Sequence, residues 1–168
     1  MPPIILAISL FFHICATVIW IGGIFLTLIL VWPEVNRTLK DQPTLYPMLQ
    51  RLRKRFTPYG NLALAVLIVT GLFQMSADSN YDGVLQFTNE WSRIILLKHI
   101  AIGGMIICGG VLQFGVSPAL ERATLLAERG KGNPAEWEKL RRREVRLTRI
   151  NAALGILILA FSTYAATL

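Results

Sequence analysis

Four long apolar segments alternate with polar segments along this chain. They cover residues 4–32, 60–76, 94–117 and 150–168. A helix needs about 20 predominantly apolar residues to cross a bilayer, within a range of about 17–25. The first segment contains no Asp, Glu, Lys or Arg. The pattern predicts an all-α integral membrane protein, with four transmembrane helices in an up-down bundle.

The polar segments indicate how these helices begin and end. Pro33 is expected to end the first helix, because proline cannot continue the backbone hydrogen-bond ladder. A short helix is expected over residues 46–56, before the second span. Pro134 fits the first turn of a helix that continues into the fourth span. We expect one membrane domain over residues 1–168, without a cleavable signal peptide, because no basic region precedes the long first run.

Charge is distributed unevenly over the polar segments. The net charge is +7, and 15 of the 17 Lys and Arg residues lie in residues 33–59 and 118–149. The segment 77–92 has no basic residue and carries three acidic ones. By the positive-inside rule, the two basic loops are cytoplasmic, and both termini lie outside, in the periplasm. We therefore expect a multi-pass protein of a prokaryotic inner membrane. Its expected partner is the lipid bilayer, and no nucleic-acid partner is expected.

Only two histidines occur, His13 and His99, and both lie inside apolar segments. Ionisable side chains at membrane depth are rare because their desolvation is expensive, and they usually face a partner, a cofactor or a cavity. The first and third spans enter from the same side. At 1.5 Å per residue, both imidazoles lie at depths of roughly 8–14 Å. This matched pair is the candidate functional site.

Helical spacing places small and aromatic residues beside each histidine. Ala16 and Trp20 follow His13 by three and seven residues, and Gly103 follows His99 by four. Residues at these spacings share one helix face. Ala16 and Gly103 leave room for a flat macrocycle or for a closely packed helix.

Lys98 is the only lysine within a span, and Arg93 lies about one turn further out. Each could extend toward the outer interface or pair with an acidic group such as a haem propionate. The expected cofactor-binding residues are therefore His13, His99, Lys98, Arg93, Trp20, Ala16 and Gly103.

Two imidazoles at one depth are a standard axial ligand pair for b-type haem. Four-helix bundles commonly hold such groups between facing helices. We expect haem b between the first and third spans, transferring electrons to a periplasmic redox partner or to quinol. The protein would act within a larger membrane complex or a homo-oligomer. No catalytic residue is assigned, and the sequence leaves open whether the protein is an enzyme.

Copper is the alternative cofactor, because soft thioether ligands favour Cu(I). Met75, near the outer end of the second span, could join His13 and His99 as metal ligands. Cys15 and Cys108 lie about 160° and 180° around their helices from the neighbouring histidine. A third interpretation is a cofactor-free assembly subunit, in which the histidines only form interhelical hydrogen bonds.

Several motifs resemble the copper-resistance D (CopD) membrane domain. They are His13-x6-Trp20-Ile21-Gly22-Gly23, the basic segment 51–56, Thr70-Gly71, Leu97-Lys98 and the arginine-rich approach to the last span. The resemblance implies a four-helix membrane module associated with copper uptake or resistance. The same elements are similar to the HemJ-type protoporphyrinogen oxidases. That likeness implies bound haem b, with roles for His13 and Lys98.

Overall fold

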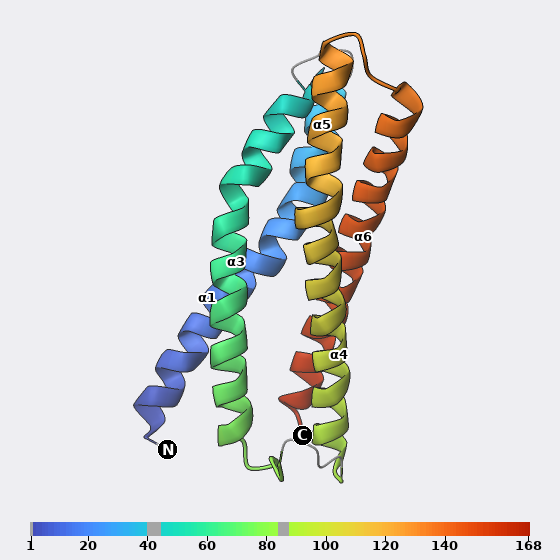
Figure 1. Cartoon of the computed structure of the whole chain (residues 1–168). Helices are drawn as coiled ribbons and strands as arrows, with labels where there is room; N and C mark the ends of the chain where they lie inside the picture. The colour runs from blue at the N-terminus through green and yellow to red at the C-terminus, as the bar shows by residue number, and fades with distance from the viewer. Residues whose placement is uncertain (1, 40–44, 84–87) are drawn as a thin grey trace.

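The computed structural model describes residues 2–39, 45–83 and 88–168. All regular structure in these residues is helical (Figure 1). The elements in chain order are α1 (Pro3–Leu26), a π-helical segment (Thr27–Val31), α2 (Trp32–Leu39), α3 (Leu45–Ala77), α4 (Glu90–Gly110), a second π-helical segment (Val111–Val116), α5 (Ser117–Glu128) and α6 (Pro134–Ala165).

Within the described residues, four continuous helices are long and apolar enough to span a membrane. They are Pro3–Glu34, Pro47–Ala77, Glu90–Glu128 and Pro134–Ala165. The helices alternate in direction, so that both termini lie at one end of the bundle (Figure 1). We call this the terminal end, and the end where α5 is followed by α6 the basic end. The predicted all-α, four-helix membrane fold is confirmed.

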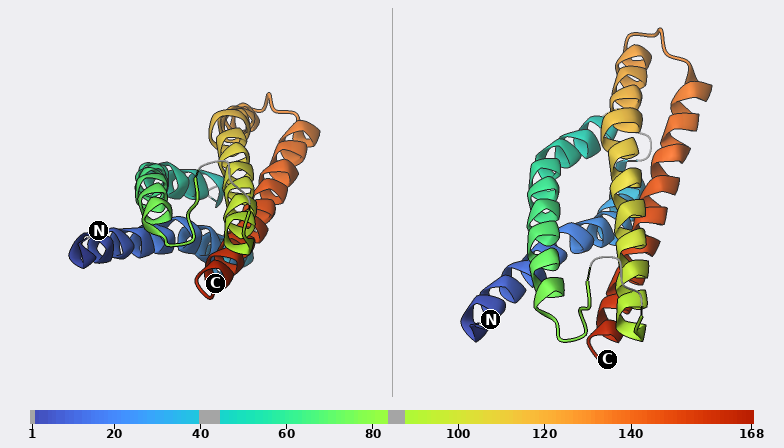
Figure 2. Two further views of the ribbon diagram at one scale, coloured as in Figure 1. Left: turned by 90° about the horizontal axis from the view of Figure 1, so that it is seen from below. Right: turned by 60° about the horizontal axis from the view of Figure 1, so that its bottom comes forward.

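The long helices are organised as two pairs, one of α1 with α3 and one of α4 with α6. The pairs diverge toward the terminal end, whereas α3 leans toward α5 at the basic end (Figures 1 and 2). Where α1 meets the second pair, Ile21 packs with Met105 and Ile158 in a buried apolar core. This core holds the pairs together at mid-height.

Each π-helical segment ends two residues before a proline. Thr27–Val31 is followed by Trp32 and Pro33, and Val111–Val116 by Ser117 and Pro118. Proline lacks the N–H of the helical ladder, and its ring collides with the preceding turn. A π-turn is wider and changes the hydrogen-bond register. The helix therefore continues through both prolines, and the prediction that Pro33 ends the first helix is wrong.

The sequence predicted the start of α6 correctly, but it did not predict the full length of α3. The expected short helix over residues 46–56 is instead the first part of α3, which continues through Pro58. The prediction for α6 is confirmed, because this helix runs unbroken from Pro134 into the last span. The Asn133 side chain caps it by accepting hydrogen bonds from the backbone N–H groups of Ala135 and Glu136.

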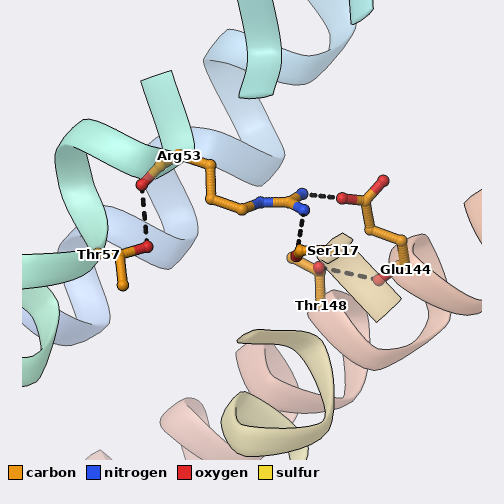
Figure 3. A network of polar contacts seen from close by, with 5 residues as sticks. All are labelled: Arg53, Thr57, Ser117, Glu144 and Thr148. Atoms are coloured by element: carbon orange, nitrogen blue, oxygen red, sulfur yellow. Dashed lines mark hydrogen bonds and ion pairs between the residues drawn. The ribbon is translucent and has the colours of Figure 1, made fainter. Parts of the chain in front are cut away.

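At the basic end, Arg53 of α3 connects the two helix pairs (Figure 3). Its guanidinium donates to Ser117 Oγ at 2.7 Å and forms an ion pair with the buried Glu144 of α6. Lys54 adds a second ion pair from α3 to Glu121 of α5, at 2.5 Å. Polar contacts thus tie the helix pairs together at the end where their axes converge.

Arg141 makes a separate contact between α6 and the first helix. Its guanidinium lies 4.5 Å from the ring centroid of Trp32 and 5.4 Å from that of Trp137. Such cation–π contacts contribute about 0.5–2 kcal/mol each, depending on exposure. This stacking holds the end of the first membrane helix against α6.

The Arg53–Glu144 pair should dominate the stability of the basic end. The Glu144 side chain is 5% exposed and that of Arg53 is 38% exposed. Replacing Glu144 with alanine removes the buried partner of this guanidinium. Because the remaining Arg53 is partly exposed, we expect the free energy of unfolding in detergent to fall by about 1.5–3 kcal/mol, the range for losing a hydrogen bond to a charged group.

Glu138→Ala is the matched control on the same helix. Glu138 pairs with Arg142 at 2.9 Å, but their side chains are 46% and 76% exposed. An exposed helical pair of this kind contributes only about 0.3–0.5 kcal/mol. Equal loss of stability in the two variants would show that Arg53 and Glu144 do not connect the helix pairs.

Candidate functional site

A pocket of about 450 Å³ lies between the helix pairs, in the half of the bundle nearer the terminal end. It is lined by residues of α1, α3, α4 and α6, most of them apolar. Its volume lies within the roughly 300–1,000 Å³ typical of small-molecule and cofactor sites. Five of the residues that the sequence singled out line it together: His13, Trp20, Met75, Lys98 and His99.

A hydrogen-bond chain orients the imidazole of His13. Its Nδ1 lies 2.8 Å from Thr70 Oγ1 on the neighbouring helix α3. The Thr70 hydroxyl donates its own proton to the carbonyl oxygen of Val66, at 2.6 Å. The oxygen of Thr70 therefore accepts a hydrogen bond from His13 Nδ1–H. This network assigns the proton to Nδ1 and leaves a lone pair on Nε2.

Gly71 provides the space that the His13 ring occupies. A Cβ atom at position 71 would lie 3.3 Å from Cε1 of His13, which is closer than ordinary van der Waals contact. Thr70 and Gly71 thus act on one side chain, since the first holds the ring and the second makes room for it. The sequence interpretation did not assign either residue to the site, although their dipeptide was part of the family resemblance.

The imidazole of His99 has the same tautomer through a different partner. Its Nδ1 lies 2.7 Å from the carbonyl oxygen of Ile95, one turn earlier in α4. A carbonyl can only accept, so Nδ1 carries the proton and Nε2 has a free lone pair. Histidines that bind metals usually donate their second ring N–H to such an acceptor. The Nδ1 contacts of both histidines therefore leave a lone pair on Nε2.

Charged and sulfur-containing groups complete the pocket lining. Lys98 adds a positive charge beside His99, and Asp78, just after α3, adds a negative one. Met75 contributes a thioether near the end of α3. Trp91, near the start of α4, is 5% exposed and also lines the pocket.

Three of the expected cofactor-binding residues lie outside the pocket lining. Ala16 is buried, Arg93 is exposed, and a Cβ added to Gly103 would meet no atom within 4 Å. Among the described residues, no group of three or more His, Cys, Asp and Glu side chains could hold a metal ion. In the described part of the chain, at most two such side chains could therefore bind one metal ion in this pocket, and Met75 adds a thioether to its lining.

Comparison with known proteins decides the family. The family model described as CopD, Copper resistance protein D, matches residues 50–166. This chain belongs to the CopD family. The matched region includes Met75, Lys98 and His99, whereas His13 lies before it. No curated protein and no solved structure matches the chain.

The family and the fold together establish the general character of the protein. Its four spanning helices and its CopD membership identify a multi-pass inner-membrane protein related to copper resistance. The resemblance inferred from the scattered motifs is confirmed by this match.

The role of Thr70 can be tested without any bound ligand. Thr70→Val keeps the shape of the side chain but removes the acceptor for His13 Nδ1–H. A neutral hydrogen bond contributes about 1 kcal/mol. We expect the Nδ1–H to Nε2–H tautomer ratio of His13 to fall roughly fivefold, as measured by ¹⁵N NMR of the labelled protein.

His99 serves as an internal reference, because Ile95 and not Thr70 holds its tautomer. Thr163→Val is the external control, since the exposed Thr163 hydroxyl donates to the carbonyl of Ala160 in its own helix. The assignment is wrong if Thr70→Val leaves the His13 tautomer unchanged or shifts both histidines alike.

Proposed function

We propose that this CopD protein binds copper in the pocket, through Nε2 of His13 and Nε2 of His99, as part of copper transport or resistance. The observation that supports this most strongly is the shared tautomer of the two imidazoles. Each has its Nδ1–H committed to an acceptor, and both line one pocket. The family membership favours copper as the metal.

The remaining ligand chemistry supports Cu(I). Imidazole nitrogen is a suitable copper ligand, and a thioether selects the softer Cu(I) ion. Met75 lines the same pocket and is our proposed third ligand. The pocket lining extends to residues of the terminal end, which the positive-inside rule places in the periplasm. Copper would then enter from outside the cell.

Haem b held by the same two imidazoles is the second candidate. Lys98 favours it, because an ammonium group in the pocket attracts a propionate and repels a copper ion. The pocket volume is also within the range of cofactor sites. In this case the protein would transfer electrons to a periplasmic partner or to quinol, within a larger complex or a homo-oligomer.

The first experiment is copper titration of the detergent-purified chain under reducing conditions, with a reduced-minus-oxidised visible spectrum of the same sample. We expect stoichiometric copper and no haem bands. His13→Ala and His99→Ala should each weaken copper binding by more than about a hundredfold, beyond the usual cost of a second-shell change. Met75→Leu should weaken Cu(I) binding by roughly tenfold, because it removes a soft ligand.

Met48→Leu is the matched control, because Met48 is an exposed methionine of the same helix, outside the pocket lining. Equal effects of the two methionine substitutions would remove Met75 from the site. A sharp α-band without copper would put haem b first. A sample with neither copper nor haem would overturn both candidates and favour a cofactor-free assembly subunit.

Lys98→Gln separates the two candidates by the sign of its effect. For unit charges about 8–16 Å apart at an effective dielectric constant of 20, the repulsion is about 1–2 kcal/mol. Its removal should raise copper affinity by about five- to thirtyfold. The same variant should retain less haem, because a propionate loses its partner. Arg93→Gln changes the same charge outside the pocket lining and should alter neither affinity.

A further inference from the structure

One face of α6 carries a basic groove whose lining shares no residue with the pocket described above. Arg142, Arg146 and Arg149 line it at spacings of four and three residues, together with Val145, Ile150 and Ala153. Its volume is about 520 Å³. Residues at these spacings lie above one another on a helix, so the three arginines form a single stripe.

Two of these arginines have no acidic partner among the residues that the structure describes. Arg142 pairs with Glu138, one turn earlier in the helix. In the described part of the chain, no carboxylate pairs with Arg146 or Arg149, and both side chains are exposed. Arginine presents planar, bidentate donors that match the geometry of a phosphate group. The groove therefore offers two unpaired donors to an anion.

The same face continues as an apolar surface into the span. Ile150 is 40% exposed and Leu157 is 46% exposed, and Ala153 between them is also exposed. Arg149 comes directly before this apolar surface, at the start of the fourth apolar segment of the sequence. A ligand with a phosphate and a long hydrocarbon chain would contact both parts at once.

We infer that this face of α6 is a binding site for an anionic phospholipid. Arg146 and Arg149 bind the phosphate, and an acyl chain lies along Ile150, Ala153 and Leu157. Basic clusters at the cytoplasmic ends of spans are attracted to anionic headgroups. An acidic soluble protein would match the charges but would leave the apolar part of the face without a partner. This inference does not depend on the proposed copper site.

The test measures lipid retention by the full chain in detergent, using native mass spectrometry. Phosphatidylglycerol and phosphatidylcholine with identical acyl chains are the probes. We expect tighter binding of phosphatidylglycerol, and a loss of at least about tenfold in its affinity in the double variant Arg146→Gln, Arg149→Gln. Phosphatidylcholine retention should change little.

The matched control is the double variant Lys139→Gln, Arg143→Gln. It removes the same charge from the same helix, and both residues are exposed and outside the groove lining. Unchanged affinity in this control supports a defined site, whereas an equal loss would show general attraction to a basic surface and overturn the proposal.

Competition distinguishes a lipid from its phosphate alone. Inorganic phosphate at low millimolar concentration should not displace phosphatidylglycerol, because it lacks the acyl contacts. Complete displacement would assign the groove to free phosphate and overturn the lipid proposal. Because all the substituted side chains are exposed, both double variants should unfold at the same temperature as the parent chain.

Discussion

Within a membrane, a polar group must find its partner inside the protein, and this constraint organises the whole molecule. It requires helical spans, because helices satisfy their backbone groups within one segment. It also explains the threonine hydroxyls that donate to carbonyls four residues earlier, as Thr17 and Thr70 do. The same requirement holds His13 to Thr70 across two helices. Outside the spans, burial of the Glu144 carboxylate in the protein likewise requires its ion pair with Arg53.

These cross-helix contacts divide the bundle into two regions with different properties. At the basic end, the ion pairs of Arg53 and Lys54 draw α3 toward α5 and α6. Below them, the apolar core around Ile21 and Met105 closes the space between the pairs. The helices diverge only beyond this core, and there the pocket forms. The pocket therefore forms between the two helix pairs at the terminal end, beyond the last contacts that hold the pairs together.

The pocket combines ligands that a metal can use with a charge that opposes a metal. The hydrogen bonds of His13 and His99 leave both Nε2 lone pairs available. Lys98 places a positive charge in the same lining, and Asp78 places a negative one there. The balance between these groups determines whether the pocket suits a bare cation or an anionic macrocycle. For this reason the charge of Lys98 is as informative as the identity of the ligands.

The sequence alone determined the number of spans, the alternation of charge and the start of α6, because apolar length and proline position are local properties. It also singled out His13 and His99, since the free-energy cost of burying an imidazole in a membrane depends on the apolar residues around it.

The sequence could not determine that the helix continues past Pro33, because that depends on a π-turn that only the backbone geometry shows. Nor could it assign Thr70 as the partner of His13, or show that Ala16 and Gly103 lie outside the pocket lining. Those outcomes depend on how two helices cross and rotate, which is decided by side-chain packing between segments far apart in the chain.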